Sequence, residues 1–385
     1  MSWEVVKLEE LYDVHNGLSK GGKFFGSGYP FLTFSTVFNH YFIPENITDY
    51  VQSTPKEQEN YSIHRGDIFV TRTSETSDEL GMSCVALKDY PKATYNGFTK
   101  RMRPKTDRVL PEYIGYYMRM PSFRSEFQAF STMTTRASLK NEDLLSLKIS
   151  LPPIETQRRI ANFLSAYDDL IKNNQKQIKL LEEAAQRLYK EWFVDLRFPG
   201  YEDVAVVDGV PEGWSKKLID NVIGKVDRSK QIKTADYLSE GSIPVIDQSR
   251  DFIAGYTNDA EALVNIDCPV IVFGDHTRIL KYIQFPFAKG ADGTQLIVSI
   301  NENMPQSLLY CSLIAIDLSN YHYARHFKYL KAESILVPTK EIADKFDCIV
   351  SLILQKTQKL WDMSYKAVQA RDRLLPKLMS GELEV

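Results

Sequence analysis

Two overlapping glycine motifs near the N-terminus have the spacing of nucleotide- and cofactor-binding loops. The segment Gly17–Lys23 has Walker A spacing, but the next residue is Phe24, where Mg²⁺ binding needs a Ser or Thr hydroxyl. Phe24–Gly28 fits the F-x-G-x-G of many methyltransferase cofactor sites, yet Pro30 comes at once after it and leaves no ordinary helix N-terminus for the cofactor's charged end. The Asn/Asp-Pro-Pro-Tyr/Phe partner motif is absent. We interpret the stretch as a loop, with a methyltransferase as the alternative that S-adenosylmethionine binding by the isolated chain would support.

Nuclease and metal motifs are also missing from the sequence. No Glu-x-Lys triplet occurs, so the usual carboxylate–lysine pair of metal nucleases is not available. His322 and His326 are spaced i, i+4, but the glutamate of H-E-x-x-H is absent, and Arg325 and Lys328 would repel a cation. The four cysteines lack C-x-x-C spacing and are interpreted as buried thiols of a cytosolic protein. We therefore expect no catalysis, no metal and no cofactor in this chain.

Basic residues in the loops of both halves are candidates for DNA contact, because Arg and Lys bind phosphates and base edges. The net charge of -3 is mild evidence against DNA binding, although a patch can be basic while the whole is not. Each cluster taken alone also fits a solvated face, and the recurrence in both halves strengthens the case. The candidates are Lys20, Lys23, Arg72, Lys100, Arg101, Arg103, Arg136, Arg228, Lys230, Arg250, Arg278, Arg325 and Lys328.

Two long amphipathic segments must position these loops. Apolar residues recur at steps of three and four from Ile160 to Trp192, and the stripe returns from Ile342 to Leu374, a shift of 182 residues. Each stripe has one polar member, Asn174 or Lys356, and we expect the two to meet in an antiparallel coiled coil. The alternative is that each helix packs on its own domain. The expected pair interface comprises Ile160, Leu164, Ile171, Asn174, Ile178, Leu181, Phe346, Ile353, Lys356, Leu360 and Met363.

A globular region with β-rich runs precedes each helix. Both regions have a tryptophan near their start, Trp3 or Trp214, contain a buried-strand pattern, and end in a strand that runs into proline. A helix is predicted over residues 111–130. The predicted fold is two mixed α/β (α+β) heads and two long antiparallel coiled-coil helices in an internal repeat. The expected boundaries are 1–153 (head 1), 154–197 (first helical region), 198–338 (head 2) and 339–385 (second helical region).

Three segments resemble the specificity subunits of type I restriction-modification systems. They are Leu151–Ile160, Arg187–Leu196 and Arg373–Leu383, at the entry and exit of the first helix and the end of the second. The resemblance implies that each head is a target-recognition domain and that the heads bind two half-sites of a bipartite double-stranded DNA target. It also implies that two methyltransferase subunits dock on the chain and methylate adenine with S-adenosylmethionine. Restriction subunits join that complex, and none of this chemistry belongs to the chain itself.

The helix length gives the resemblance a physical meaning. About 35 helical residues span roughly 50 Å, which corresponds to on the order of one to one and a half turns of DNA between the half-sites. Inserting one heptad in both helices is expected to lengthen the spacer. The competing hypothesis of a protein adaptor predicts no salt-dependent DNA affinity. No run of eighteen apolar residues exists, and we expect a cytoplasmic protein without membrane contact.

Overall fold

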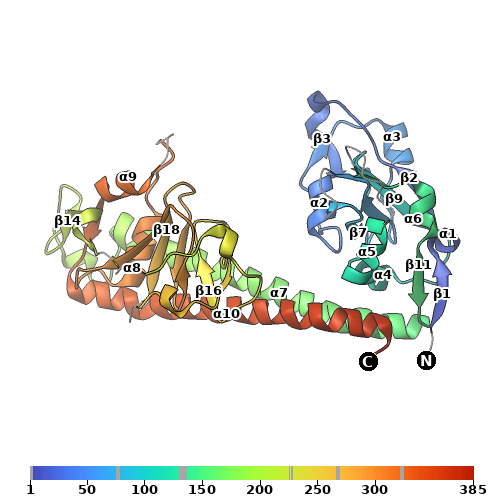
Figure 1. Ribbon diagram of the computed structural model, residues 1–385. Helices are drawn as coiled ribbons and strands as arrows, with labels where there is room; N and C mark the ends of the chain where they lie inside the picture. Colours follow the sequence, from blue (N-terminus) through green and yellow to red (C-terminus); the bar gives the residue numbers. More distant parts are fainter. Residues whose placement is uncertain are drawn as a thin grey trace. The chain divides into compact units, whose positions relative to one another are not determined.

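The computed structural model describes residues 3–74, 79–129, 137–224, 226, 229–265, 269–320 and 325–385. The chain divides into two compact units (Figure 1). Unit 1 comprises Met1–Ile171 and Lys366–Val385, and unit 2 comprises Lys172–Tyr365. Each unit therefore contains one head and one part of each long helix, α7 (Ile154–Tyr189) and α10 (Lys340–Ser380).

Head 1 is built on two small sheets with helices around them. The four-stranded sheet has the order β2-β9-β5-β7, and the three-stranded sheet has the order β4-β3-β8. The strands are β2 (Tyr12–Asn16), β3 (Phe25–Leu32), β4 (Tyr50–Val51), β5 (Ile68–Thr71), β7 (Ser83–Val85), β8 (Thr94–Tyr95) and β9 (Thr99–Pro104), with β6 (Thr73–Ser74) and β10 (Ala137–Ser138) forming a separate pair. The helices are α1 (Leu8–Leu11), α2 (Phe34–Asn39), α3 (Pro55–Asn60), α4 (Pro111–Tyr117), α5 (Pro121–Ala129) and α6 (Asn141–Ser146).

Head 2 repeats this topology. Its four-stranded sheet has the order β15-β21-β18-β19, and its three-stranded sheet has the order β17-β16-β20. In both three-stranded sheets one edge strand is antiparallel and the other is parallel to the central strand. The strands are β15 (Ile223–Gly224), β16 (Ile243–Ile246), β17 (Gly255–Thr257), β18 (Val270–Gly274), β19 (Leu280–Ile283), β20 (Ala288–Lys289) and β21 (Thr294–Ser299), with a hairpin of β12 (Val206–Val207) and β13 (Val210–Pro211); the helices are α8 (Gln306–Ile314) and α9 (Phe327–Ala332).

A two-stranded ladder connects each head to its long helix, with the same register in both units. β1 (Glu4–Lys7) pairs with β11 (Lys148–Leu151), and β14 (Ser215–Leu218) pairs with β22 (Ser334–Val337). In each ladder the first residue of the first strand lies opposite the last residue of the second strand, and two residues then lead into the long helix. The two heads are thus two copies of one frame, although their sequences differ.

In unit 1, the start of α7 packs against the end of α10. Ile160 and Leu164 belong to the same hydrophobic core as Leu375 and Leu378, and that core continues into head 1. Because residues near the beginning of one helix contact residues near the end of the other, the pairing is antiparallel. Residues of α1, α4, α5, α6 and both long helices contribute to this core, so head 1 packs directly against the helix pair of its unit.

In unit 2, the remaining parts of the same helices also pack together in antiparallel fashion. The ring of Phe346 lies 6.4 Å from that of Tyr189 and 5.8 Å from that of Trp192. Helix α8 contributes Leu308 and Cys311 to this core, between the four-stranded sheet and the long helices. After Tyr189 the helix continues as a short π-helix, Lys190–Val194. The predicted fold class is therefore confirmed, and in each unit the helices pair with each other as well as with the head.

The predicted repeat shift of 182 residues is wrong by about one helical turn. The ladder strands β11 and β22 are 186 residues apart, and with this shift the buried residues Ile160, Leu164, Asn174 and Ile178 of α7 coincide with buried residues of α10. Those counterparts are Phe346, Val350, Leu360 and Ser364. A displacement of four residues along a helix is one full turn plus only ~40°. The apolar spacing of three and four residues is therefore still present with the wrong shift, but the residues it selects are centred to one side of the buried face.

The shift corrects two of the predicted interface residues. Lys356 is exposed and Met363 is 48% exposed, so neither lies in the seam between the helices. Asn174 is buried at 2% exposure, and its amide nitrogen has no hydrogen-bond partner among the residues that the structure describes. The predicted contact between Asn174 and Lys356 is therefore wrong. Of the other predicted members, Ile171, Leu181 and Ile353 are half-buried.

The structure also tests the helix predicted over residues 111–130, the absence of a membrane-spanning helix in the described residues, and the burial of the cysteines. The helix predicted over 111–130 is two helices, α4 and α5, because Pro121 cannot continue the first and instead begins the second. No helix within the described ranges is long and apolar enough to cross a membrane. Cys84 and Cys311 are buried as expected, whereas Cys348 is exposed, and Cys268 lies outside the described residues.

Candidate nucleic-acid interface

In head 1, four chain segments meet where the interior strand β5 ends. The amide of Arg72, the residue after β5, donates to the carbonyl of Phe98 over 3.0 Å, and the amide of Leu139 donates to the carbonyl of Arg72 over 3.0 Å. The hydroxyl of Tyr95 donates to the carbonyl of Asn16 over 3.0 Å, which brings in the end of β2. We call this region the loop edge of head 1; it comprises Asn16–Ser19, Arg72, Asn96–Phe98 and Leu139–Asn141.

Head 2 has the same edge at the end of β18. The amide of Asp275 donates to the carbonyl of Gly293 over 2.7 Å, and the amide of His326 donates to the carbonyl of Asp275 over 2.9 Å. The Gln248 side chain accepts from the amide of His276 over 3.1 Å and donates to the carbonyl of Asp292 over 2.8 Å. We call this region the loop edge of head 2; it comprises Gln248, Asp275–Arg278, Gly290–Gly293 and Arg325–Lys328.

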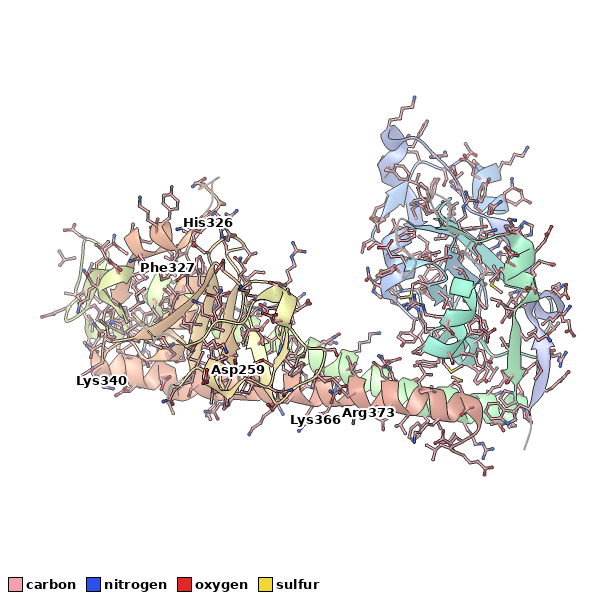
Figure 2. The ribbon with its side chains drawn as sticks, viewed as in Figure 1. Asp259, His326, Phe327, Lys340, Lys366 and Arg373 are labelled. Atoms are coloured by element: carbon pink, nitrogen blue, oxygen red, sulfur yellow. The ribbon has the colours of Figure 1, made fainter. Side chains whose placement is uncertain are left out.

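The loop edge of head 2 lies away from the long helices of its unit. Figure 2 shows His326 and Phe327 on the side of head 2 opposite α10, where Lys340 is labelled, while Asp259 lies close to α10. The Asp275 carboxylate accepts from the amide of Phe327 over 2.8 Å, which fixes the start of α9 at this edge. The edge is therefore a surface that the helix pair leaves open.

Three predicted basic residues lie on the loop edge of head 2. Arg325 and Lys328 are exposed, and the Arg278 guanidinium donates to the carbonyl of Leu318 over 2.9 Å. Arg278 and Arg325 have backbone φ values of 61° and 80°. The left-handed region is unfavourable for residues with a Cβ, and such residues cluster at binding and catalytic sites.

The other predicted residues of head 2 lie elsewhere. The Lys230 ammonium forms an ion pair with Asp259 at 2.6 Å, on the side of the head near α10. Arg250 lines a cavity together with Trp361 of α10, so it also faces the helix and not the loop edge. Arg228 and His322 lie outside the described residues.

In head 1, the structure shows that the basic run on β9 is largely buried. Lys100 and Arg101 are 5% and 4% exposed, and Arg103 forms an ion pair at 2.7 Å with Asp67, which is fully buried. Burial lowers the pKa of Lys100 and of Arg101, whereas the hydrogen bond to Asp67 raises the pKa of Arg103. Lys100 and Arg101 are therefore not the surface residues that the sequence predicts, because β9 is an interior strand of its sheet and both are buried on it. Arg103 is half-buried, and its ion pair holds it against Asp67.

The remaining predictions in head 1 have mixed outcomes. Arg72 lies on the loop edge, where its guanidinium donates to the side-chain oxygen of Asn16 over 3.2 Å. Lys20 forms an ion pair with Glu57 at 2.8 Å. Lys23 is exposed, and its ammonium lies 5.1 Å from the centroid of the Phe24 ring. Arg136 lies outside the described residues.

The sequence reasoning missed a group of exposed aromatic side chains on head 1. Phe98 on the loop edge is 57% exposed, and Phe25, Tyr29 and Tyr50 on β3 and β4 are 41%, 37% and 43% exposed. The Lys92 ammonium lies 5.5 Å from the centroid of the Tyr29 ring. The aromatic residues of the run Phe24–Tyr29 are visible in the sequence and could have indicated these exposed rings. The interpretation of the run as a loop did not consider them.

The glycines of that run have a structural explanation. Gly26 and Gly28 have φ values of 92° and 102° within β3, where the register against β4 shifts. A Cβ on Gly28 would lie 2.6 Å from the carbonyl oxygen of Val51. The F-x-G-x-G spacing therefore belongs to a bulged strand.

Within the described parts of the chain, no group of three His, Cys, Asp or Glu side chains is placed to hold a metal ion.

The fold consists of two heads built on one frame and two long helices, and known proteins share this fold. Residues 1–183 match the family model described as the type I restriction modification DNA specificity domain. The type I restriction enzyme MjaIX specificity subunit of Methanocaldococcus jannaschii is 26% identical over 418 residues, covering 100% of this chain and 94% of that protein. The HindI specificity subunit of Haemophilus influenzae is 27% identical over 209 residues, covering 53% of this chain and 44% of that protein.

A solved structure shares the fold over nearly the whole chain. The S subunit of a type I restriction-modification system from M. genitalium aligns with a TM-score of 0.60 and 16% identity, covering 98% of this chain and 96% of that chain. The chain is thus similar over its whole length to a specificity subunit of a type I restriction enzyme in sequence, and to an S subunit in fold. Members of this class recognise DNA, assemble with other subunits and are not themselves enzymes.

Proposed function

We propose that each head recognises one half of a bipartite double-stranded DNA target through its loop edge. In this proposal residues 1–153 and 198–338 are the two target-recognition domains, and residues 154–197 and 339–385 are the helical regions that join them. Two methyltransferase subunits dock on the chain and methylate adenine within the bound target, and restriction subunits join through the complex. The chain contributes recognition and holds no cofactor.

One observation carries the proposal: the two heads share a frame and a register but present different side chains at the same edge. Head 1 presents Arg72 and Phe98 there, and head 2 presents His276, Arg278 and Arg325. Two domains that recognise different DNA sequences need this combination of one shared fold and different side chains at the binding surface. Arginine is well suited to base recognition, because its guanidinium can bind O6 and N7 of guanine together.

The geometry suggests different roles for the basic residues. Arg72 and Arg278 are each held by a hydrogen bond within the head, to Asn16 and to Leu318, so less side-chain freedom is lost on binding. We assign these two to base edges. Lys23 and Lys328 are exposed and carry long flexible side chains, which suits them to phosphates. Arg325 lies on the loop edge of head 2, and we assign it to contact with either a DNA phosphate or a base.

The test is co-expression with the cognate methyltransferase subunit, followed by mapping of methylated adenines in genomic DNA. Arg72→Ala is expected to relax one position of one half-site, and Arg278→Ala one position of the other, each at a cost of about 1–3 kcal/mol. Lys328→Ala is expected to weaken binding to all sequences alike and to reduce the salt slope by about one.

Lys230→Ala is the matched control, because Lys230 is paired with Asp259 and lies off the loop edge. It should leave both the methylated motif and the salt dependence unchanged. The assignment of the edges would be refuted if Arg72→Ala and Arg278→Ala left every position of the motif intact while the complexes still assembled and methylated DNA.

A further inference from the structure

The same turn leads into an interior strand of each head, β9 in head 1 and β21 in head 2. The hydroxyls of Thr99 and Thr294, the first residues of these strands, each donate to the carbonyl three residues earlier, over 2.7 Å and 2.8 Å. The residue before each threonine accepts a backbone hydrogen bond from the residue that follows the neighbouring strand, β5 or β18. These two residues, Phe98 and Gly293, therefore occupy equivalent places in the two heads.

In head 1, the ring at this place is exposed although its backbone is fixed. Phe98 is 57% exposed. Its amide donates to the side-chain oxygen of Asn96 over 2.6 Å, and its carbonyl accepts from the amide of Arg72 over 3.0 Å. The preceding Gly97 packs against Ser19, where an added Cβ would lie 2.3 Å from the hydroxyl oxygen. A rigid turn thus holds an apolar ring in water, where most of its surface is not buried by head 1.

In head 2, the equivalent place carries no side chain. Gly293 has a φ of 84°, and an added Cβ would lie 2.7 Å from the ring of His276 and 2.8 Å from the side-chain nitrogen of Gln248. The Gln248 side chain bridges this turn, because its nitrogen donates to the carbonyl of Asp292 over 2.8 Å and its oxygen accepts from the amide of His276 over 3.1 Å. The two loop edges therefore differ in chemistry at one place of the shared frame, with an apolar ring in head 1 and an amide and an imidazole in head 2.

The loop edge of head 1 surrounds the ring with basic and amide side chains. Its segments contain Arg72, Lys140 and the asparagines Asn16, Asn96 and Asn141, and no acidic residue. Arginine, lysine and asparagine are the residue types that contact phosphates and base edges. The surroundings of the ring therefore fit DNA.

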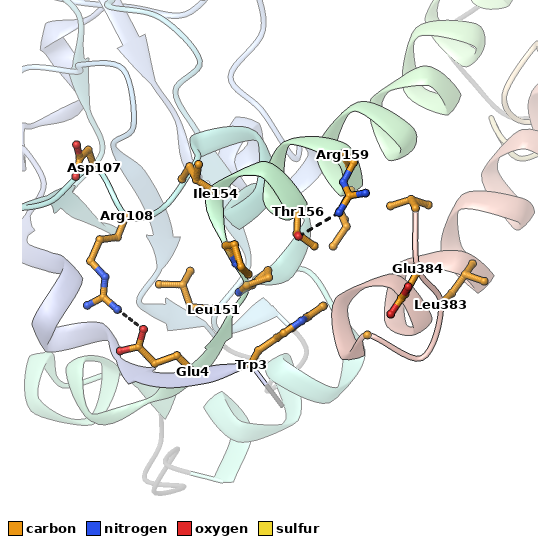
Figure 3. A pocket seen from close by; sticks show the side chains of 15 residues that line it. Trp3, Glu4, Asp107, Arg108, Leu151, Ile154, Thr156, Arg159, Leu383 and Glu384 are labelled. Atoms are coloured by element: carbon orange, nitrogen blue, oxygen red, sulfur yellow. Dashed lines mark hydrogen bonds and ion pairs between the residues drawn. The ribbon is translucent and has the colours of Figure 1, made fainter. Parts of the chain in front are cut away.

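Another apolar surface of unit 1, the wall of a cavity beside Trp3, differs in its charges (Figure 3). The charged residues of this wall are Glu4, Asp107, Glu384, Arg108 and Arg159. Figure 3 shows Arg108 paired with Glu4, at a distance of 2.6 Å. Carboxylates repel the phosphates of DNA, so this surface lacks the charge that the loop edge offers.

We propose that Phe98 contacts the C5-methyl group of a thymine in the half-site that head 1 binds. This methyl is the apolar group by which thymine differs from the other bases in the major groove, and phenylalanine is among the side chains that contact it. Arg72, which is hydrogen-bonded to Phe98 through the backbone, contacts a neighbouring base. Head 2 has no ring at the equivalent place and recognises no thymine methyl there. This assignment rests on the proposed function and adds one base of the target to it.

The test uses the complex with the cognate methyltransferase subunit and a DNA duplex that carries the mapped target. Each thymine of the target, on both strands, is replaced in turn by deoxyuridine, which removes the methyl group and keeps the base pair. Replacement of the contacted thymine should weaken binding by the unmodified complex about fourfold, the value expected for one methyl group that is no longer buried. Phe98→Ala should bind the two duplexes equally. Phe98→Leu keeps an apolar side chain and should retain a preference for thymine of about twofold or more.

Phe25→Ala is the matched control, because Phe25 is 41% exposed in the same head but lies on β3, off the loop edge. It should keep the full preference for thymine. The proposal is wrong if no thymine can be found whose replacement causes a loss that depends on Phe98, or if Phe98→Ala weakens binding to all duplexes alike. It is also wrong if Phe98→Ala fails to fold or to assemble with the methyltransferase subunit, because the ring then serves a protein contact.

Arg72→Ala tests the proposed function separately. A methylated motif that is relaxed by Arg72→Ala, together with thymine replacements that show no dependence on Phe98, would overturn the thymine contact alone. A motif that Arg72→Ala leaves intact would instead count against the assignment of the loop edge itself.

Discussion

A buried ionic cluster in unit 1 joins head 1 to both long helices, and its removal is the sharpest test of how the head is held. The Asp168 carboxylate of α7 accepts a hydrogen bond of 2.5 Å from the hydroxyl of Tyr116 in head 1 and another of 2.5 Å from the guanidinium of Arg371 in α10. The Arg371 side chain is only 12% exposed, and its guanidinium lies 5.0 Å from the ring centroid of Tyr41. Burial acts to lower the pKa of Arg371, but the hydrogen bond to Asp168 and its charge raise the pKa overall.

The perturbation is Asp168→Asn, which keeps the shape of the side chain and removes its charge. Arg371 then remains buried without a compensating anion. Hydrogen bonds to charged groups contribute about 1.5–3 kcal/mol each, and breaking a fully buried ion pair costs about 3–5 kcal/mol. Because the Asp168 side chain is 28% exposed, we expect a loss at the lower end, about 2–4 kcal/mol in the stability of unit 1.

The assay uses thiols that report each unit separately. Cys84 in unit 1 and Cys311 in unit 2 are both fully buried, and burial raises the pKa of each to about 12. Both should react with a thiol reagent only when their unit opens, while the exposed Cys348 reacts in the folded state. A loss of about 3 kcal/mol corresponds to a ~100-fold faster reaction of Cys84. The rate for Cys311 should not change.

A double-mutant cycle with Arg371→Met separates the ion pair from other effects. We expect a coupling energy of about 2 kcal/mol or more between Asp168→Asn and Arg371→Met. The control is the exposed pair Glu155 and Arg158, also in unit 1, whose coupling should stay below about 0.5 kcal/mol. A coupling near zero at Asp168 and Arg371, or equal acceleration at Cys84 and Cys311, would refute the role assigned to this cluster.

Head 1 offers two further tests. Gly28→Ala should destabilise the head by about 2 kcal/mol or more, because the added Cβ would lie 2.6 Å from a backbone oxygen. Gly26→Ala should cost about 1 kcal/mol, because its Cβ meets no atom and only its positive φ is unfavourable. The reaction rate of Cys84 measures both effects. Arg103→Met leaves Asp67 buried without its cation and should cost about 3 kcal/mol by the same measurement, while Lys23→Met should leave that rate unchanged and weaken DNA binding with a shallower salt dependence. Equal stability of Arg103→Met and Lys23→Met would contradict the structural role given to Arg103.

The elements with strong periodicity were predictable, and the position of their buried face was less so. The two long helices, the tryptophan that opens each head and the strand that runs into proline were all visible as repeated patterns. The repeat shift was not, because a displacement by about one turn preserves a three-four pattern. It exchanges Val350 for Phe346 as the counterpart of Leu164, and Leu360 for Lys356 as the counterpart of Asn174. Only the strand ladders, which have no such ambiguity, fix the shift.

Basic residues gave the least reliable prediction of the site. Lys100, Arg101 and Arg103 form a run without an acid nearby in sequence, which is typical of a surface patch. Their partners come from distant segments, such as Asp67 for Arg103 and the carbonyl of Ser62 for Arg101. A charge that is paired across a sheet cannot be recognised before the sheet is known.

The sequence by itself determined the class of the protein, the two-fold repeat of head and helix, and the two long amphipathic helices, because these depend on residue types at short, regular spacing. The tertiary structure decided which residues of those helices are buried and which basic side chains reach the loop edges. These properties depend on contacts between segments far apart along the chain, and no local pattern encodes such contacts.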